Sequence, residues 1–101
     1  METFKRISVQ EAHELIVTQA VTIVDIRDSK SFELGHIENA YRLNEVNIDS
    51  FITKIDKEIP LICYCYHGIS SQQAAHFLAS QGFKEVFSID GGWEAWRDTY
   101  V

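Results

Sequence analysis

Short β-branched runs alternate with stretches of helical periodicity along this chain, and that alternation limits its possible folds more than any other feature. Apolar runs long enough for a buried strand, but too short for a buried helix, occupy residues 21–26, 61–64 and 86–89, and residues 41–43 are expected to form another short strand. Helical patterns separate them, at residues 8–18, 28–35, 47–59 and 70–82, and a last helix follows residues 91–92. The order predicts an α/β fold in which a central parallel sheet carries helices on both faces.

Several helix ends carry recognisable signals. Ser8 and Glu11 form the S-x-x-E pattern of a capping box, and Asp28 or Ser29 can cap the short second helix. Gly82 stands where a helix that begins near residue 70 would end in a left-handed residue. These signals fix the boundaries between the predicted elements.

Length and charge narrow the function classes. With 101 residues, we expect residues 1–101 to form a single domain. Fifteen acidic against nine basic residues give a net charge of −6, which argues against a nucleic-acid partner. The N-terminal segment has no apolar stretch of the export type, and no run approaches the roughly 18 apolar residues of a membrane span. We therefore expect a cytoplasmic protein without a membrane partner.

Two cysteines stand two positions apart, at Cys63 and Cys65. On an extended strand their Cα atoms would lie about 6.6 Å apart, which is near the upper limit for a disulfide. We expect two free thiols, as in a reducing compartment. A Cys-x-Cys metal site would need two more ligands, and His67 and His76 do not have ligand spacing, so we expect no metal.

Cys65 ends a predicted strand and is followed by a turn that contains Gly68 and by a helix that starts near Ser70. The first amides of a helix have no partner within the helix, and the amides of such a turn can converge on one point. A thiolate held there would have a lowered pKa and would be nucleophilic at neutral pH. A buried structural cysteine is the simpler alternative for Cys65, and it is the interpretation that we favour for Cys63.

Four segments together resemble a known family. They are Val24-Asp-Ile-Arg27, Phe32-Glu-Leu-Gly-His-Ile37 with Ala40, Cys63-Tyr-Cys-Tyr-His-Gly-Ile-Ser-Ser71, and Ser88-Ile-Asp-Gly-Gly-Trp93 with Trp96. Their order is that of the single-domain rhodaneses, in particular the GlpE-type thiosulfate sulfurtransferases, and they span nearly the whole chain.

The resemblance implies a rhodanese-like fold and a ping-pong reaction through a persulfide on Cys65. Thiosulfate or another small sulfur donor would load the cysteine, and cyanide, thioredoxin or another thiol would unload it. No metal or organic cofactor is implied. The substrate-binding group would be the backbone of the turn, formed by Tyr66, His67, Gly68, Ile69 and Ser70.

The turn departs from many thiosulfate-specific rhodaneses, which carry basic side chains there. Here the side chains are Tyr, His, Ile and Ser, and Ile69 stands where the GlpE-type loop has a polar residue. Only His67 can become cationic, with a charge that depends on pH. We therefore expect weaker thiosulfate binding than in relatives with a basic loop.

Side chains outside the turn receive mainly structural predictions. Asp25 and Arg27 are expected to form an ion pair or cap that fixes the neighbouring loop, and His36 a structural hydrogen bond. Trp93 and Trp96 share one helix face and are expected in the core, with Trp93 also able to line the mouth of a pocket. Tyr66 could form a wall of that pocket.

Three other functions remain as alternatives. A phosphatase of related fold would need an Arg six residues after the cysteine, and Ser71 stands there instead. A rhodanese-like binding module commonly lacks the cysteine, which this chain keeps. A persulfide carrier fed by a protein donor needs the same cysteine chemistry as a thiosulfate enzyme. The Cys-Gly-Ser/Thr-Gly loop of mercaptopyruvate sulfurtransferases is absent.

Overall fold

A computed structural model describes residues 4–101, and its centre is one sheet of five parallel strands. Met1–Thr3, the start of the segment in which we expect no export signal, lie outside the described residues. The strand order is β1-β5-β4-β2-β3, and every neighbouring pair is parallel. The strands are β1 (Lys5–Ile7), β2 (Thr22–Asp25), β3 (Tyr41–Arg42), β4 (Leu61–Tyr64) and β5 (Val86–Ile89). The predicted parallel α/β architecture is confirmed.

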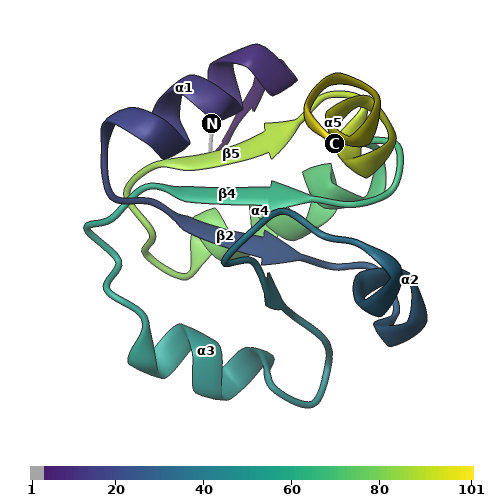
Figure 1. The fold of residues 1–101 in the computed structure, drawn as a ribbon. Coiled ribbons are helices and arrows are strands. Elements are labelled where there is room, and N and C mark those ends of the chain that lie inside the picture. The colour runs from purple at the N-terminus through teal and green to yellow at the C-terminus, as the bar shows by residue number, and fades with distance from the viewer. Residues whose placement is uncertain (1–3) are drawn as a thin grey trace.

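Helices cover both faces of the sheet, as the sequence pattern predicts (Figure 1). They are α1 (Val9–Thr18), α2 (Ser29–Leu34), α3 (Ile48–Lys54), α4 (Ser70–Ser80) and α5 (Gly92–Tyr100). Helices α1 and α5 lie together on one face, α3 and α4 lie on the other, and α2 lies beyond the carboxyl ends of the strands. Among the described residues, no helix has the length and apolar character needed to cross a bilayer.

Each face of the sheet has its own apolar core. On one side Ile23, Ile62 and Ile89 pack with Trp93 and Trp96, which brings α1 and α5 onto the sheet. On the other side, residues of β2, β4 and β5 pack against α3 and α4. The strand residues are Val24, Leu61, Cys63 and Val86, and the helix residues are Phe51, Ala75 and Leu78. Because successive residues of a strand point to opposite faces, a strand as short as β4 contributes to both cores.

The local signals in the sequence produce the expected helix ends. Ser8 caps α1, and the reciprocal bonds of the capping box with Glu11 are 3.1 and 2.8 Å long. Asp28 caps α2 through the amide and hydroxyl of Ser31. Gly82, with φ of +101°, follows α4 in the left-handed conformation predicted for it.

Strand β1 is the element that the sequence did not predict. It is three residues long, two of them exposed, and it pairs with β5 at the edge of the sheet. A strand this short and polar has no periodicity of its own, so its conformation comes from the partner strand.

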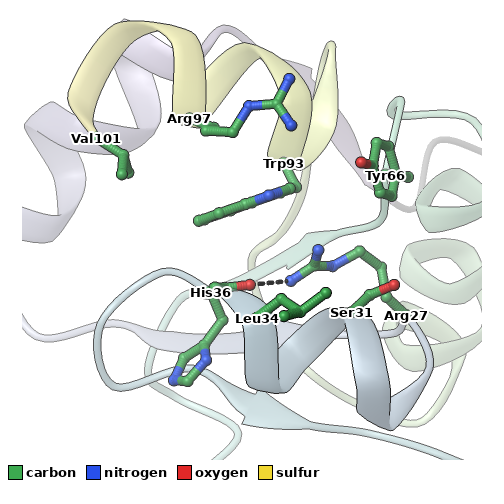
Figure 2. Close-up of a pocket in the computed structure, with 9 residues that line it drawn as sticks. Arg27, Ser31, Leu34, His36, Tyr66, Trp93, Arg97 and Val101 are labelled. Atoms are coloured by element: carbon green, nitrogen blue, oxygen red, sulfur yellow. Dashed lines mark hydrogen bonds between the residues drawn. The ribbon is translucent and has the colours of Figure 1, made fainter.

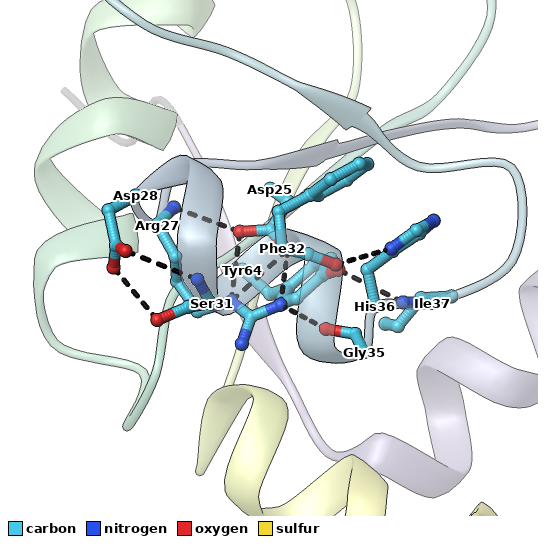
Figure 3. A network of polar contacts seen from close by, with 9 residues as sticks. All are labelled: Asp25, Arg27, Asp28, Ser31, Phe32, Gly35, His36, Ile37 and Tyr64. Atoms are coloured by element: carbon cyan, nitrogen blue, oxygen red, sulfur yellow. Dashed lines mark hydrogen bonds and ion pairs between the residues drawn. The ribbon is translucent and has the colours of Figure 1, made fainter.

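A buried ion pair fixes the segment after β2 (Figure 3). Arg27 Nε and Nη2 both bond the Asp25 carboxylate, at 2.7–3.1 Å, and Nη2 also donates to the carbonyl of Gly35 at 2.7 Å. The Asp25 side chain is fully buried and that of Arg27 is 4% exposed. The predicted ion pair is confirmed, and it ties the end of α2 to the carboxyl edge of the sheet.

Replacing Arg27 with Met should destabilise the fold by about 3–5 kcal/mol, because it leaves the Asp25 carboxylate buried without its counter-ion. The matched control is Arg6→Met, which breaks the pair of Arg6 with Asp90, whose side chains are 60% and 44% exposed. That exposed pair should contribute less than about 1 kcal/mol. Urea unfolding of the three proteins measures both differences, and equal losses would contradict the structural role of the buried pair.

Candidate active site

Cys65 follows β4 directly, at the carboxyl edge of the sheet where ligands of parallel α/β proteins bind. The residue is 7% exposed. Its carbonyl accepts a hydrogen bond of 2.8 Å from the amide of Trp93 in the first turn of α5. The cysteine is therefore held at the edge of the sheet by its backbone, with its thiol turned into the following loop.

Two backbone amides and one hydroxyl group lie within hydrogen-bond distance of the sulfur. The amides of Gly68 and Ser71 lie 3.1 and 3.3 Å from Sγ, and the Ser71 hydroxyl oxygen lies 3.4 Å away. Ser71 is in the first turn of α4, where amides have no helical acceptor. Ile69 precedes that helix and provides no side-chain cap, so the positive end of α4 points at the sulfur.

These donors lower the pKa of Cys65. Burial by itself acts to raise that pKa, but the hydrogen bonds from the hydroxyl and amide of Ser71, and from the amides of Gly68 and His67, outweigh burial. In contrast, burial raises the pKa of the Cys63 thiol, an effect that the nearby Cys65 increases. Both cysteines are free thiols, as predicted, and only Cys65 has surroundings that favour a thiolate.

Two glycines allow the loop to close around the sulfur. Gly68 has φ of +90°, and a Cβ there would lie 2.7 Å from the amide nitrogen of Gly91. Gly92 has φ of +56°, and a Cβ there would overlap the carbonyl of Cys65 and lie 2.8 Å from that of Tyr66. Any larger residue at either position would push apart the cysteine loop and the turn before α5.

The side chains of the predicted binding turn point mostly to solvent. Tyr66 and Ile69 are 40% and 74% exposed, and Ser70 is also exposed. His67 is exposed and pairs with Glu94 of α5 at 3.2 Å. The turn therefore offers its backbone to the sulfur, and its side chains form the surface around the opening.

Sequence reasoning missed Ser71 as a donor to the sulfur. The predicted group ended at Ser70, whereas the structure places the amide and hydroxyl of the next residue on Sγ. The position was visible as the first turn of a helix, but the direction of its side chain was not. Ser88 of β5 was missed as well, and its hydroxyl lies 2.8 Å from that of Ser71.

A cavity of about 380 Å³ lies beside the loop, between α2 and α5 (Figure 2). Tyr66 and Trp93 form walls of it, and the guanidinium groups of Arg27 and Arg97 face it. Trp93 packs in the core, as predicted, and it also lines this cavity. Among residues 4–101, neither Cys65 nor any acidic side chain lines the cavity, although the chain as a whole is acidic.

The remaining histidine prediction concerns His36, whose Nδ1 lies 2.7 Å from the carbonyl of Phe32. The ring also stacks on that of Phe32, with centroids 3.7 Å apart. The expected structural hydrogen bond is confirmed. Within residues 4–101, no three side chains of His, Cys, Asp or Glu come together as metal ligands would.

Comparisons with known proteins agree on one family. A family model described as a rhodanese-like domain matches residues 8–99. The thiosulfate sulfurtransferase GlpE of Ectopseudomonas mendocina is 55% identical over 100 residues, which cover 99% of this chain and 91% of that protein. The protein of the same name from Shewanella oneidensis is 48% identical over 98 residues, 97% of each chain. The solution structure of a rhodanese-like domain from Anabaena sp. superposes with a TM-score of 0.83 at 26% identity, covering 99% of this chain and 76% of that one.

Iodoacetamide should modify Cys65 and spare Cys63 in the folded protein at neutral pH. The lowered pKa of Cys65 keeps its thiolate populated, whereas the raised pKa and full burial of Cys63 protect that thiol. The modification rate of Cys65 should follow a titration whose midpoint lies below that of the same residue in the urea-unfolded chain. Peptide mapping by mass across a pH series measures both rates, and equal midpoints in the folded and unfolded chains would contradict the role of the donors.

Proposed function

Because the chain belongs to the rhodanese-like domain family, we propose that it is a thiosulfate sulfurtransferase that carries sulfur as a persulfide on Cys65. The chain has the rhodanese-like fold, and relatives named thiosulfate sulfurtransferase match nearly all of it. The observation that carries the proposal is the set of two amides and one hydroxyl within 3.1–3.4 Å of a single sulfur. Such a set suits a sulfur atom that must hold negative charge.

The first half-reaction begins with the Cys65 thiolate, which attacks the outer sulfur of thiosulfate. A new S–S bond forms on Cys65, the S–S bond of thiosulfate breaks, and sulfite leaves with the electron pair. The persulfide that remains is anionic, and the donors that lower the thiol pKa also stabilise this product. No cofactor takes part in these steps.

The second half-reaction transfers the outer sulfur to a nucleophile. Cyanide attacks that sulfur to give thiocyanate, and the Cys65 thiolate leaves with the electron pair of the broken S–S bond. A thiol, such as that of reduced thioredoxin, would attack in the same way and become a persulfide. A lowered pKa favours this step too, because it makes Cys65 a better leaving group.

The turn from Tyr66 to Ser70 would bind thiosulfate chiefly through its backbone amides. Its side chains offer no fixed positive charge, and His67 is engaged with Glu94. With a net charge of −6, the protein does not attract anions over its whole surface. Affinity for the dianion would therefore come from local amides and from the positive end of α4.

A persulfide carrier fed by a protein donor is the second candidate. The observation that favours it is the apolar rim of the opening, where Ile69 and Tyr66 are 74% and 40% exposed. Apolar side chains around a reactive cysteine suit contact with another protein better than capture of a small dianion. In either case, residues 1–101 would act as one cytoplasmic domain, consistent with two free thiols.

Incubation with thiosulfate should add the mass of one sulfur atom to the reduced protein and none to its Cys65→Ser variant. Intact mass measured without reductant, after removal of excess thiosulfate, detects the product, and cyanide should discharge it. If neither protein gains sulfur from thiosulfate but the wild type gains it from a persulfidated cysteine desulfurase, the protein-fed carrier is correct. Hydrolysis of p-nitrophenyl phosphate that disappears in Cys65→Ser would instead support a phosphatase.

Replacing Ser70 with Arg should lower the KM for thiosulfate. Ser70 is exposed at the first position of α4, so the new guanidinium would add a fixed positive charge beside the opening without the desolvation cost of burying a charge. Steady-state kinetics with cyanide as acceptor measure the change, and Ser80→Arg, at the other end of the same helix, is the matched control. An unchanged KM would show that loop charge does not limit thiosulfate binding.

A further inference from the structure

Two buried serines lie next to the reactive sulfur: Ser71 contacts it, and Ser88 contacts Ser71. The Ser71 hydroxyl oxygen lies 3.4 Å from Cys65 Sγ and 2.8 Å from the hydroxyl oxygen of Ser88, and both serines are fully buried. Ser71 comes from α4, whereas Ser88 comes from β5, where it pairs in register with Cys63 of β4. The Ser88 side chain therefore faces α4, on the same side of the sheet as both cysteines.

The hydroxyl hydrogens available determine which serine donates and which accepts in this pair of hydrogen bonds. Each hydroxyl has one hydrogen to donate, and among residues 4–101 the side chain of Ser88 has the Ser71 oxygen as its hydrogen-bond partner. A buried hydroxyl hydrogen without an acceptor is unfavourable, so Ser88 donates to Ser71. Ser71 then accepts from Ser88, and its own hydrogen is available for Sγ: the neutral thiol donates to the Ser71 oxygen, and the thiolate accepts from the Ser71 hydroxyl. If Ser71 donated to Ser88 instead, the hydrogen of Ser88 would have no acceptor among these groups.

We propose that Ser88 is a positioning residue for the sulfur-transfer reaction: its hydroxyl turns the hydrogen of Ser71 onto Cys65 Sγ and so favours the anionic sulfur. The inference rests on the proposed function of Cys65. It involves no proton transfer along the chain, since only the direction of two hydrogen bonds is fixed. The thiol proton leaves Cys65 for solvent when the thiolate forms.

A serine in the first turn of a helix has a competing arrangement. Its hydroxyl can donate to a backbone carbonyl three or four residues earlier in the chain. The Ser71 oxygen would then only accept, and it would take the thiol hydrogen of Cys65. That arrangement stabilises the neutral thiol. The bond from Ser88 opposes it, because it fills one of the two lone pairs of the Ser71 oxygen and polarises the Ser71 hydroxyl, which makes its hydrogen a better donor to the anionic sulfur.

The other charged or titratable groups near the site come from β2, β4, the loop and α5. They include the Asp25–Arg27 pair, Cys63, Tyr64, Tyr66 with Arg97, and the pair of His67 with Glu94. Within the described residues, the hydroxyl of Ser88 hydrogen-bonds none of them. An effect of Ser88 on the ionisation of Cys65 must therefore pass through Ser71.

The test is a double-mutant cycle of Ser88→Ala and Ser71→Ala, read out by the pH dependence of Cys65 alkylation with iodoacetamide. Ser88→Ala should raise the thiol pKa and slow alkylation about three- to tenfold at a pH below that pKa, as expected for weakening one hydrogen bond to a charged group. The plateau rate at high pH should stay unchanged, because access to the thiol is unaltered. In the Ser71→Ala background, Ser88→Ala should have no further effect.

Val86→Ala is the matched control, because Val86 is buried on the same face of the same strand and does not bond Ser71. It should lower the midpoint of urea unfolding without moving the alkylation titration. An unchanged pKa in Ser88→Ala, or an equal shift with and without Ser71, would overturn the proposal. Alkylation needs no sulfur donor, so this result is independent of whether thiosulfate loads Cys65.

Discussion

The site depends on backbone hydrogen bonds between the loop after β4 and the segment after β5. Amides of Trp93 and Glu94 donate to the carbonyls of Cys65 and Tyr66, at 2.8 and 3.1 Å, so the start of α5 is bonded to the start of the cysteine loop. Gly68 and Gly92 make this approach possible, because a Cβ on either would collide with the opposite segment. With the loop held in this way, its amides are directed at the sulfur before any substrate arrives. The order of the parallel strands, with β5 beside β4, brings the two segments together.

Positive potential at this site has a local origin. The chain is acidic overall, and the guanidinium nearest the carboxyl end of β2, that of Arg27, is paired with the buried carboxylate of Asp25. The amides of Gly68 and Ser71 do not depend on ionisation or on the net charge of the protein. Oriented backbone dipoles in a site that is largely closed to water interact more strongly with a charge than they would in solvent. The sulfur can therefore be anionic in an acidic protein without a basic side chain in its loop.

Most of the fold could be predicted from local sequence, because local chemistry decides most of its elements. The capping box of Ser8 and Glu11 and the cap at Asp28 act within four residues, and so does the left-handed position at Gly82. Strand β1 could not be predicted in this way, because its conformation comes from pairing with residues more than 80 positions away. The same limit applies to the site. The sequence predicts a site at Cys65 and the turn that follows it, but the contact of Ser71 with Ser88 joins two elements across a core and has no local signal.

Cys63 in β4 and Cys65 just after it show that burial alone does not decide the chemistry of a thiol. Cys63 is fully buried and Cys65 nearly so, and desolvation acts to raise the pKa of both. They point to the same side of the sheet, two residues apart, so strand geometry does not distinguish them either. The difference is that Cys63 packs among apolar side chains such as Val24 and Leu78, whereas Cys65 lies where the strand has ended and free amides begin. The lowered pKa of Cys65 therefore comes from its place at the junction between the end of β4 and the start of α4.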